Sequence, residues 1–173
     1  PLDTYTGNIQ LNVTAVTELT HLFLPAMLER QRGRILNIGS TASFQPGPNA
    51  AVYFATKAYV RFFSEALAEE LRGSGVTVTC LCPGPTRTGF GAHSAMDDAP
   101  LFKFAMDSAP VARAGYQAMR RGRTTIITGL GNKLLALSSK VTPNWIVRKV
   151  TQQLMALPET DPNQQSSAHN NSN

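Results

Sequence analysis

The 173-residue sequence contains few cysteines and few charged residues. Its two cysteines, Cys80 and Cys82, are separated by one residue, which excludes a disulfide framework. Charged residues make up 16% of the chain against an average of about 25%, and apolar residues make up 42%, so the chain can bury a sizeable core. It has neither an uninterrupted apolar run of about 18 residues nor a basic-then-apolar signal segment at its start. We therefore expect no membrane span and a reducing, cytoplasmic setting.

The net charge of +5 arises from 16 basic and 11 acidic residues, and basic residues gather at 30–34 and 120–123. Such clusters can hold phosphate, but short basic clusters at the ends of elements are more often solvated surface. Because no aromatic-rich basic motif accompanies them, we expect no nucleic-acid partner. Salt-dependent affinity for DNA or RNA would be the mark of that alternative.

Helical and extended patterns alternate along the chain. Apolar residues at three- and four-residue steps predict a helix over 8–30, kinked or ended locally at Pro25, after a loop-like stretch over 1–7. The other predicted elements are strands over 34–38, 76–81 and 124–128 and helices over 51–72, 109–121 and 130–156, the last broken at Pro143. This order predicts one α/β domain over 1–157, with a parallel sheet and helices on both faces. Residues 158–173, rich in Asn, Gln and Ser, are predicted to be a disordered polar tail.

Two predicted loops, 39–50 and 83–108, follow the carboxyl ends of strands, where such sheets bind their ligands. The second loop contains apolar residues that suggest a lid over an apolar or bulky substrate: Phe90, Met96, Leu101, Phe102 and Phe104. Cys80 and Cys82 point to the same side of one strand and lack a second ligand pair, so core packing is favoured over metal binding. We expect no metal.

Tyr53 and Lys57 are four residues apart in the predicted helix 51–72, so the lysine lies one turn above the tyrosine. An ammonium near a phenol favours phenolate and lowers the phenol pKa from roughly 10 toward neutrality. A tyrosine tuned in this way gives or takes a proton near neutral pH. The alternative is that Tyr53 packs in the core while Lys57 extends to water.

Ser40 ends the strand before this helix and precedes Tyr53 by thirteen residues. If the intervening loop folds back, both hydroxyls reach one substrate oxygen, where two donors polarise a carbonyl or stabilise a developing alkoxide. The alternative for Ser40 is a cap of a helix or turn, which is common after a strand.

Three segments resemble the short-chain dehydrogenases/reductases: Asn-Ile-Gly-Ser at 37–40, Tyr-Phe-Ala-Thr-Lys at 53–57 and Pro-Gly-Pro-Thr-Arg-Thr at 83–88. The similarity extends over roughly residues 1–130 in the family's order and spacing. It implies the C-terminal part of a Rossmann-like, doubly wound parallel sheet. It also implies an NAD(P)-dependent oxidoreductase that interconverts a carbonyl and an alcohol by hydride transfer.

The resemblance assigns the family's catalytic tetrad to Asn12, Ser40, Tyr53 and Lys57. It implies that Tyr53 is the general acid or base, that Ser40 holds the substrate oxygen, and that Lys57 lowers the tyrosine pKa and contacts the nicotinamide ribose. Asn12 would position a water between Lys57 and solvent. The residues themselves indicate that Asn12 lies among apolar positions of its helix, so its amide needs a buried partner. A plain buried asparagine bonded to backbone is the alternative.

The segment from Pro83 to Thr88 resembles the family's turn beside the nicotinamide. Gly84 would let the backbone approach the ring closely. The resemblance implies that Thr86, through its main chain, and Thr88, through its hydroxyl, contact the carboxamide and phosphates. An ordinary turn at the end of a strand is the alternative. The implied cofactor is NAD(P)(H), with NADP favoured and the choice left open.

The sequence departs from the family by lacking the Gly-x-x-x-Gly-x-Gly turn and the Asn-Asn-Ala-Gly segment. This predicts that the chain is the later part of a longer protein. A non-catalytic fragment or interaction module, unable to bind the dinucleotide on its own, is therefore the alternative function. The family also implies a small carbonyl or alcohol substrate and a homodimer or homotetramer that pairs through the helices of Asn12 and Tyr53.

Overall fold

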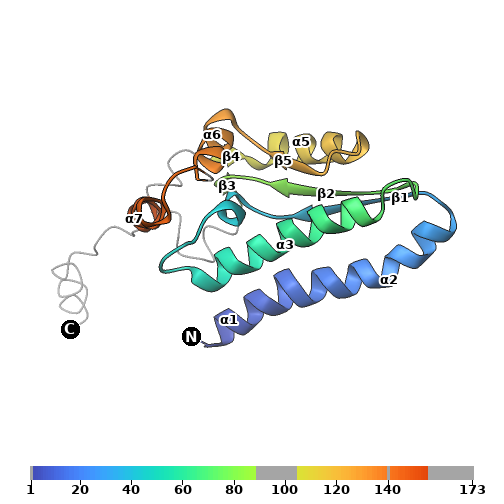
Figure 1. Ribbon diagram of the computed structural model, residues 1–173, viewed down its shortest axis with the longest axis horizontal. Coiled ribbons are helices and arrows are strands. Elements are labelled where there is room, and N and C mark those ends of the chain that lie inside the picture. The colour runs from blue at the N-terminus through green and yellow to red at the C-terminus, as the bar shows by residue number, and fades with distance from the viewer. Residues whose placement is uncertain (1, 89–104, 140, 156–173) are drawn as a thin grey trace, which may run out of the picture.

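A parallel sheet of three strands forms the centre of the computed structural model, which describes residues 2–88, 105–139 and 141–155 (Figure 1). The strands are β1 (Gly33–Ile38), β2 (Val76–Cys82) and β5 (Thr125–Ile127), in the order β1-β2-β5. The helices are α1 (Leu2–Ile9), α2 (Ala15–Glu29), α3 (Ala51–Glu70), α5 (Ser108–Arg120), α6 (Leu130–Ser138) and α7 (Asn144–Leu154). Two short strands, β3 (Thr86–Arg87) and β4 (Met106–Asp107), pair beside the sheet. The predicted α/β architecture is confirmed.

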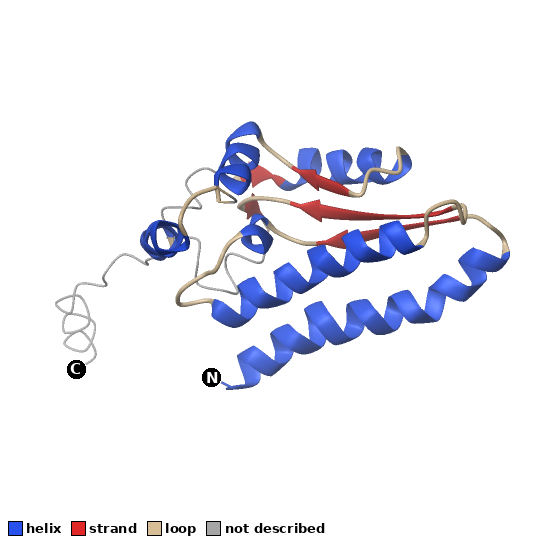
Figure 2. Cartoon of the chain, in the orientation of Figure 1, coloured by secondary structure: helices blue, strands red, loops and turns tan. Residues whose placement is uncertain are grey.

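Strand β2 is the centre of the core because it pairs on both sides and is covered on both faces. It pairs with β1 from Gly33↔Val76 to Ile38↔Leu81, and its last three residues pair with β5. Figure 2 shows α3 on one face of the sheet and α5 on the other. Every residue of β2 except Thr77 is buried, as expected for a parallel strand covered on both faces.

The two faces of β2 pack against different helices. Val60 of α3 forms a buried cluster with Cys80 and Cys82. On the opposite face, α5 approaches so closely that a Cβ on Gly115 would lie 2.6 Å from the Leu81 side chain. Both predicted packing residues, Cys80 and Cys82, are fully buried, so this part of the core prediction is confirmed.

The first helix is longer than expected. Residues 2–7 are helical, not a loop, and Thr6 and Asn8 donate side-chain hydrogen bonds to carbonyls one turn earlier, which satisfies their polar groups without leaving the helix. Pro25 does not end α2, which continues to Glu29. The turn-forming residues at 2–7 and at Pro25 therefore do not interrupt the helix, contrary to what their types suggested. Predicted residues of the lid and of the polar tail lie outside the described residues.

The continuous helix Leu2–Glu29 is long and apolar enough to cross a membrane, judged by length and composition alone. A few polar residues interrupt its apolar stretch, which is why a search for an uninterrupted run misses it. The helix is tied to the fold at Asn12, which hydrogen-bonds Thr56 of α3. This hydrogen bond places the helix alongside α3.

Candidate active site

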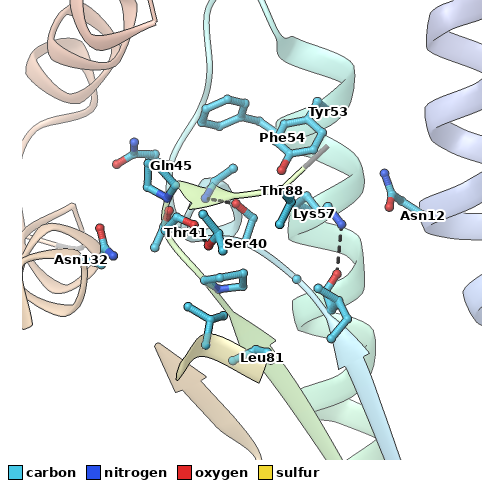
Figure 3. Close-up of a pocket in the computed structure, with 18 of the residues that line it drawn as sticks. Asn12, Ser40, Thr41, Gln45, Tyr53, Phe54, Lys57, Leu81, Thr88 and Asn132 are labelled. Atoms are coloured by element: carbon cyan, nitrogen blue, oxygen red, sulfur yellow. Dashed lines mark hydrogen bonds between the residues drawn. The ribbon is translucent and has the colours of Figure 1, made fainter. Parts of the chain in front are cut away.

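The carboxyl ends of β1 and β2 are joined by two backbone hydrogen bonds. Gly39 N–H donates to the Leu81 carbonyl at 2.8 Å, and Thr41 N–H donates to the Pro83 carbonyl at 2.9 Å. The two loops that sequence reasoning singled out therefore run side by side beyond the sheet. Next to them opens a cavity of about 550 Å³, walled by α3 on one side and by α6 and α7 on the other (Figure 3).

Gly39 crosses directly over the buried cysteine pair. The two Sγ atoms are 3.6 Å apart, and a Cβ on Gly39 would lie 2.9 Å from Cys80 Sγ and 3.1 Å from Cys82 Sγ. The hydrogen bond to Cys82 and burial both raise the pKa of the Cys80 thiol. The absence of a side chain at Gly39 thus lets the strand end pass over these thiols and deliver Ser40 to the cavity.

Ser40 is both a turn cap and a cavity residue. Its Oγ accepts a hydrogen bond from Ala42 N–H at 3.1 Å, and Ser43 Oγ accepts one from Ser40 N–H at 3.3 Å. This reciprocal arrangement fixes the 3₁₀ turn Thr41–Phe44. Ser40 also lines the cavity beside Tyr53 (Figure 3). The capping alternative and the site prediction are therefore compatible.

Tyr53 and Ser40 interact across the cavity wall. Burial raises the pKa of the Tyr53 phenol, and a side-chain hydrogen bond with Ser40 opposes that rise. The net direction is upward, so the phenol holds its proton at neutral pH. We expected Lys57 to bring this pKa down toward neutrality, and the structure differs because burial is the larger effect.

Lys57 lies one turn beyond Tyr53 but faces another group. Its Nζ donates to the Ile38 carbonyl at 3.0 Å and is 5.9 Å from the centre of the Tyr53 ring. Burial lowers the pKa of this lysine, while the thiols of Cys80 and Cys82 raise it. Lys57 also lines the cavity, so its ammonium borders the same space as the phenol.

Asn12 lies in a π-helical turn, Gln10–Thr14, between α1 and α2. Its side chain is buried, and Nδ2 donates to Thr56 Oγ1 at 3.2 Å. Thr56 Oγ1 in turn donates to the Tyr53 carbonyl at 2.9 Å. Such π-helical turns occur frequently at functional sites. The buried partner that sequence reasoning required for Asn12 is therefore a hydroxyl of α3, between Tyr53 and Lys57.

The turn after β2 forms another part of the cavity wall. Pro83, Gly84, Thr86 and Thr88 all line it, as the predicted cofactor residues should. Thr86 Oγ1 donates to the Gly84 carbonyl at 2.9 Å. A Cβ on Gly84 would lie 2.2 Å from the amide of Asn132 in α6. The side chain of Asn132 thus lies where a side chain at position 84 would be.

Two features of the site were not predicted. Arg61 is buried, lies over the rings of Phe44 and Phe62, and donates through Nη1 to the Ser43 carbonyl at 3.1 Å. It therefore holds the turn that follows Ser40. The α6–α7 wall was also missed, because nothing in its sequence pattern links it to the motifs. The only signal for Arg61 in the sequence was its position one turn after Lys57 in the same predicted helix.

The comparisons with known proteins agree with this geometry. The sequence model described as "short chain dehydrogenase" matches residues 2–99. The chain belongs to the short-chain dehydrogenase family. A short-chain dehydrogenase from Sphingobium yanoikuyae in complex with NADPH has a TM-score of 0.65 at 31% identity, covering 77% of this chain and 52% of that one.

Curated relatives of this short-chain dehydrogenase chain include named reductases. The very-long-chain 3-oxoacyl-CoA reductase of Laccaria bicolor is 47% identical over 70 residues, which cover 40% of this chain and 21% of that protein. The ketoacyl reductase HetN of a Nostoc species is 34% identical over 144 residues, which cover 79% of this chain and 50% of that protein. The chain thus spans half or less of the length of these curated relatives.

Proposed function

We propose that this chain provides the proton-transfer and substrate-binding part of an NAD(P)-dependent oxidoreductase that interconverts a carbonyl and an alcohol. The observation that carries the proposal is the pairing of the Tyr53 phenol with the Ser40 side chain at the wall of the cavity. Two hydroxyl groups that meet at one point can both donate to a single substrate oxygen. Membership of the family supports the same reaction class.

The residues of the cavity suit the nicotinamide end of a dinucleotide. The Lys57 ammonium and the backbone of the turn from Pro83 to Thr86 supply donors and acceptors of the kind that bind ribose hydroxyls and a carboxamide. We infer that Tyr53, Lys57, Pro83, Gly84, Thr86 and Thr88 hold this end. The glycine-rich turn that binds the pyrophosphate in the family is not among the 173 residues. A bound nicotinamide dinucleotide would supply or accept the hydride.

The proton moves through Tyr53 in this proposal. During reduction, the carbonyl oxygen accepts hydrogen bonds from the Tyr53 phenol and the Ser40 hydroxyl. As the carbonyl carbon is reduced, the electron pair of the C=O bond moves to oxygen, and the phenol proton passes to that oxygen to complete the alcohol. The phenolate left behind is stabilised by Ser40 and by the positive charge of Lys57 nearby. Alcohol oxidation runs these steps in reverse.

The raised pKa of Tyr53 supports the reductive direction. A phenol that stays protonated at neutral pH is ready to act as the acid, whereas oxidation requires the phenolate. The names of the two curated relatives, a 3-oxoacyl-CoA reductase and a ketoacyl reductase, agree with this direction. We therefore propose a ketone substrate with an apolar chain, which the apolar residues of the cavity accommodate: Leu36, Ile38, Leu81, Val111, Leu135, Leu154 and Met155.

Assembly and location follow from the same proposal. Large apolar side chains are exposed on α2 and α3, among them Leu19, Leu22 and Phe62. Pairing of two copies through these helices would cover them, so we propose a homodimer or homotetramer. The cytoplasmic setting expected from cysteine usage remains part of this proposal, as does the preference for NADP.

Fluorescence titration with NADPH and NADH, followed by turnover on a 3-oxoacyl thioester, tests the proposal. We expect cofactor binding in the parent chain and in Tyr53→Phe, and loss of turnover only in Tyr53→Phe. Retained turnover in Tyr53→Phe would reject the assigned role of the phenol. Absence of dinucleotide binding in both proteins would instead favour the alternative, a non-catalytic module of the family.

A further inference from the structure

The outward face of α6 is apolar, contrary to the usual pattern of a surface helix. Leu130, Leu134 and Leu137 follow one another at steps of four and three residues and so lie on one side of α6. Together with Val141, which follows the end of the helix, they are here called the α6 stripe. Their side chains are 82%, 68%, 48% and 85% exposed. The buried residue of α6 is Ala136, on the other side. A helix normally turns its leucines inward, so the α6 stripe indicates a surface that becomes covered.

The start of α7 also exposes a large apolar side chain. Trp145, the only tryptophan of the chain, is 64% exposed at the start of this helix. Arg148 and Lys149, one turn further, are exposed as well, and Lys133 lies beside the stripe on α6. Exposed leucine, tryptophan and basic residues are the combination found in helices that lie in the plane of a membrane interface.

The charge of α6 and α7 indicates which kind of partner covers this surface. No acidic residue lies in α6, α7 or the segment between them, whereas Lys133, Arg148 and Lys149 are exposed on these two helices. A second copy of this surface would bring like charges together without acidic partners. An anionic lipid surface complements both the charge and the apolar stripe, and each basic residue near it contributes about 1 kcal/mol in general.

We propose that α6 and the start of α7 dock onto an anionic lipid surface, with the α6 stripe among the acyl chains and Trp145 at the level of the headgroups. The opposite sides of the same helices line the cavity through Asn132, Leu135 and Thr151. Figure 1 shows both helices at the end of the molecule toward which the strands point. Docking would therefore bring the cavity next to the lipid phase.

Trp145 emission reports this docking directly, because no second tryptophan is present. The full chain is mixed with vesicles of phosphatidylcholine alone or of phosphatidylcholine with phosphatidylglycerol. With the anionic vesicles we expect a blue shift, quenching by brominated acyl chains and co-sedimentation that weakens as salt is added. The double variant Leu130→Gln/Leu134→Gln should lower the partition coefficient more than tenfold. Arg148→Gln should lower it about fivefold on anionic vesicles only.

Leu19→Gln/Leu22→Gln is the matched control, because it makes the same change at two exposed leucines on α2. Its partitioning should equal that of the parent chain, and thermal melting checks that each variant remains folded. Equal loss in this control would overturn the proposal in favour of the helix Leu2–Glu29. Absence of any shift in Trp145 emission would also overturn the proposal. So would a parent chain that does not bind vesicles but forms a dimer, if the Leu130→Gln/Leu134→Gln variant is monomeric, because the α6 stripe would then be a contact between two copies.

Discussion

Lys57 Nζ donates to the Ile38 carbonyl at 3.0 Å, across the gap between α3 and the end of β1. The ammonium is held in a half-buried position beside the cavity, where burial lowers its pKa. A lowered lysine pKa means that the folded protein binds this proton less tightly than the unfolded chain does. The charge at Lys57 therefore destabilises the fold, which is a common property of functional sites.

We predict that Lys57→Met stabilises the protein and abolishes turnover. The methionine keeps most of the apolar stem and removes the buried charge, and the half-exposed Ile38 leaves its carbonyl access to water. The gain in the free energy of unfolding should be complete below the lowered pKa of Lys57. It should shrink as pH rises through that pKa and vanish above the unfolded value of about 10.4.

Thermal melting across this pH range provides the measurement. Lys133→Met makes the same change at an exposed lysine of α6 and is the control for the substitution itself, which should not stabilise the protein. A Lys57→Met protein that is less stable than the parent at neutral pH would show that the bond to Ile38 outweighs the cost of burial.

Ser40→Ala should raise the pKa of Tyr53 further. The hydrogen bond with Ser40 is the contribution that opposes burial, so its removal leaves burial unopposed. Alkaline spectrophotometric titration detects the phenol, and the difference from Tyr53→Phe assigns it among the four tyrosines. The variant should also lose about 1 kcal/mol of stability, because the cap of the 3₁₀ turn is lost.

Ser43→Ala separates these two effects. Ser43 belongs to the same reciprocal cap and donates through Oγ to the Lys57 carbonyl at 2.8 Å. Its removal should lower stability by a similar amount without moving the Tyr53 titration. If both variants shift the titration equally, the effect comes from a loosened turn, and the Ser40 hydrogen bond does not set the tyrosine pKa.

Local spacing predicted the part of the site that lies on one element. Tyr53 and Lys57 share a helix, so a period of four residues was enough to place them together, and strand ends located Ser40 and Pro83. Asn12 is 44 residues from its partner Thr56. Its apolar neighbours in the sequence indicated a buried amide, but only the family resemblance placed Asn12 in the site. The sequence could not predict where the Lys57 ammonium points, because its acceptor is the backbone carbonyl of Ile38 in strand β1.

Arg61 shows what sequence patterns miss. On a helical surface an arginine four residues before Glu65 is typical of an exposed ion pair, and that pair does exist, with 3.2 Å between Nε and Oε1. Burial of the guanidinium arises from Phe44, which tertiary packing brings within 4.2 Å. The early start of α1 was missed for a related reason, since its polar residues satisfy themselves within the helix.

Arg61→Met should therefore destabilise the protein by about 2 kcal/mol. Loss of a buried partner leaves its counterpart without compensation, and the cost is moderated because Glu65 is 35% exposed and can rehydrate. Urea unfolding measures the change. Arg72→Met is the matched control, because its ion pair with Glu69 is largely exposed and should contribute less than about 0.5 kcal/mol. Equal costs in the two variants would contradict the burial argument.

Gly39→Ala should distort the entrance to Ser40. The new methyl group would lie 2.9 Å from Cys80 Sγ, closer than these atoms can pack, so the strand end or the thiol must move at a cost of about 1–3 kcal/mol. Adding Cys80→Ala should restore part of that loss, and the double variant should be more stable than the sum of the two single changes predicts.

Gly7→Ala tests whether any glycine would respond in this way. No atom lies within 4 Å of the Cβ position at Gly7 in α1, so this change should stabilise the helix by about 1 kcal/mol. Strict additivity between Gly39→Ala and Cys80→Ala would mean that the thiol does not determine the need for glycine at this crossing.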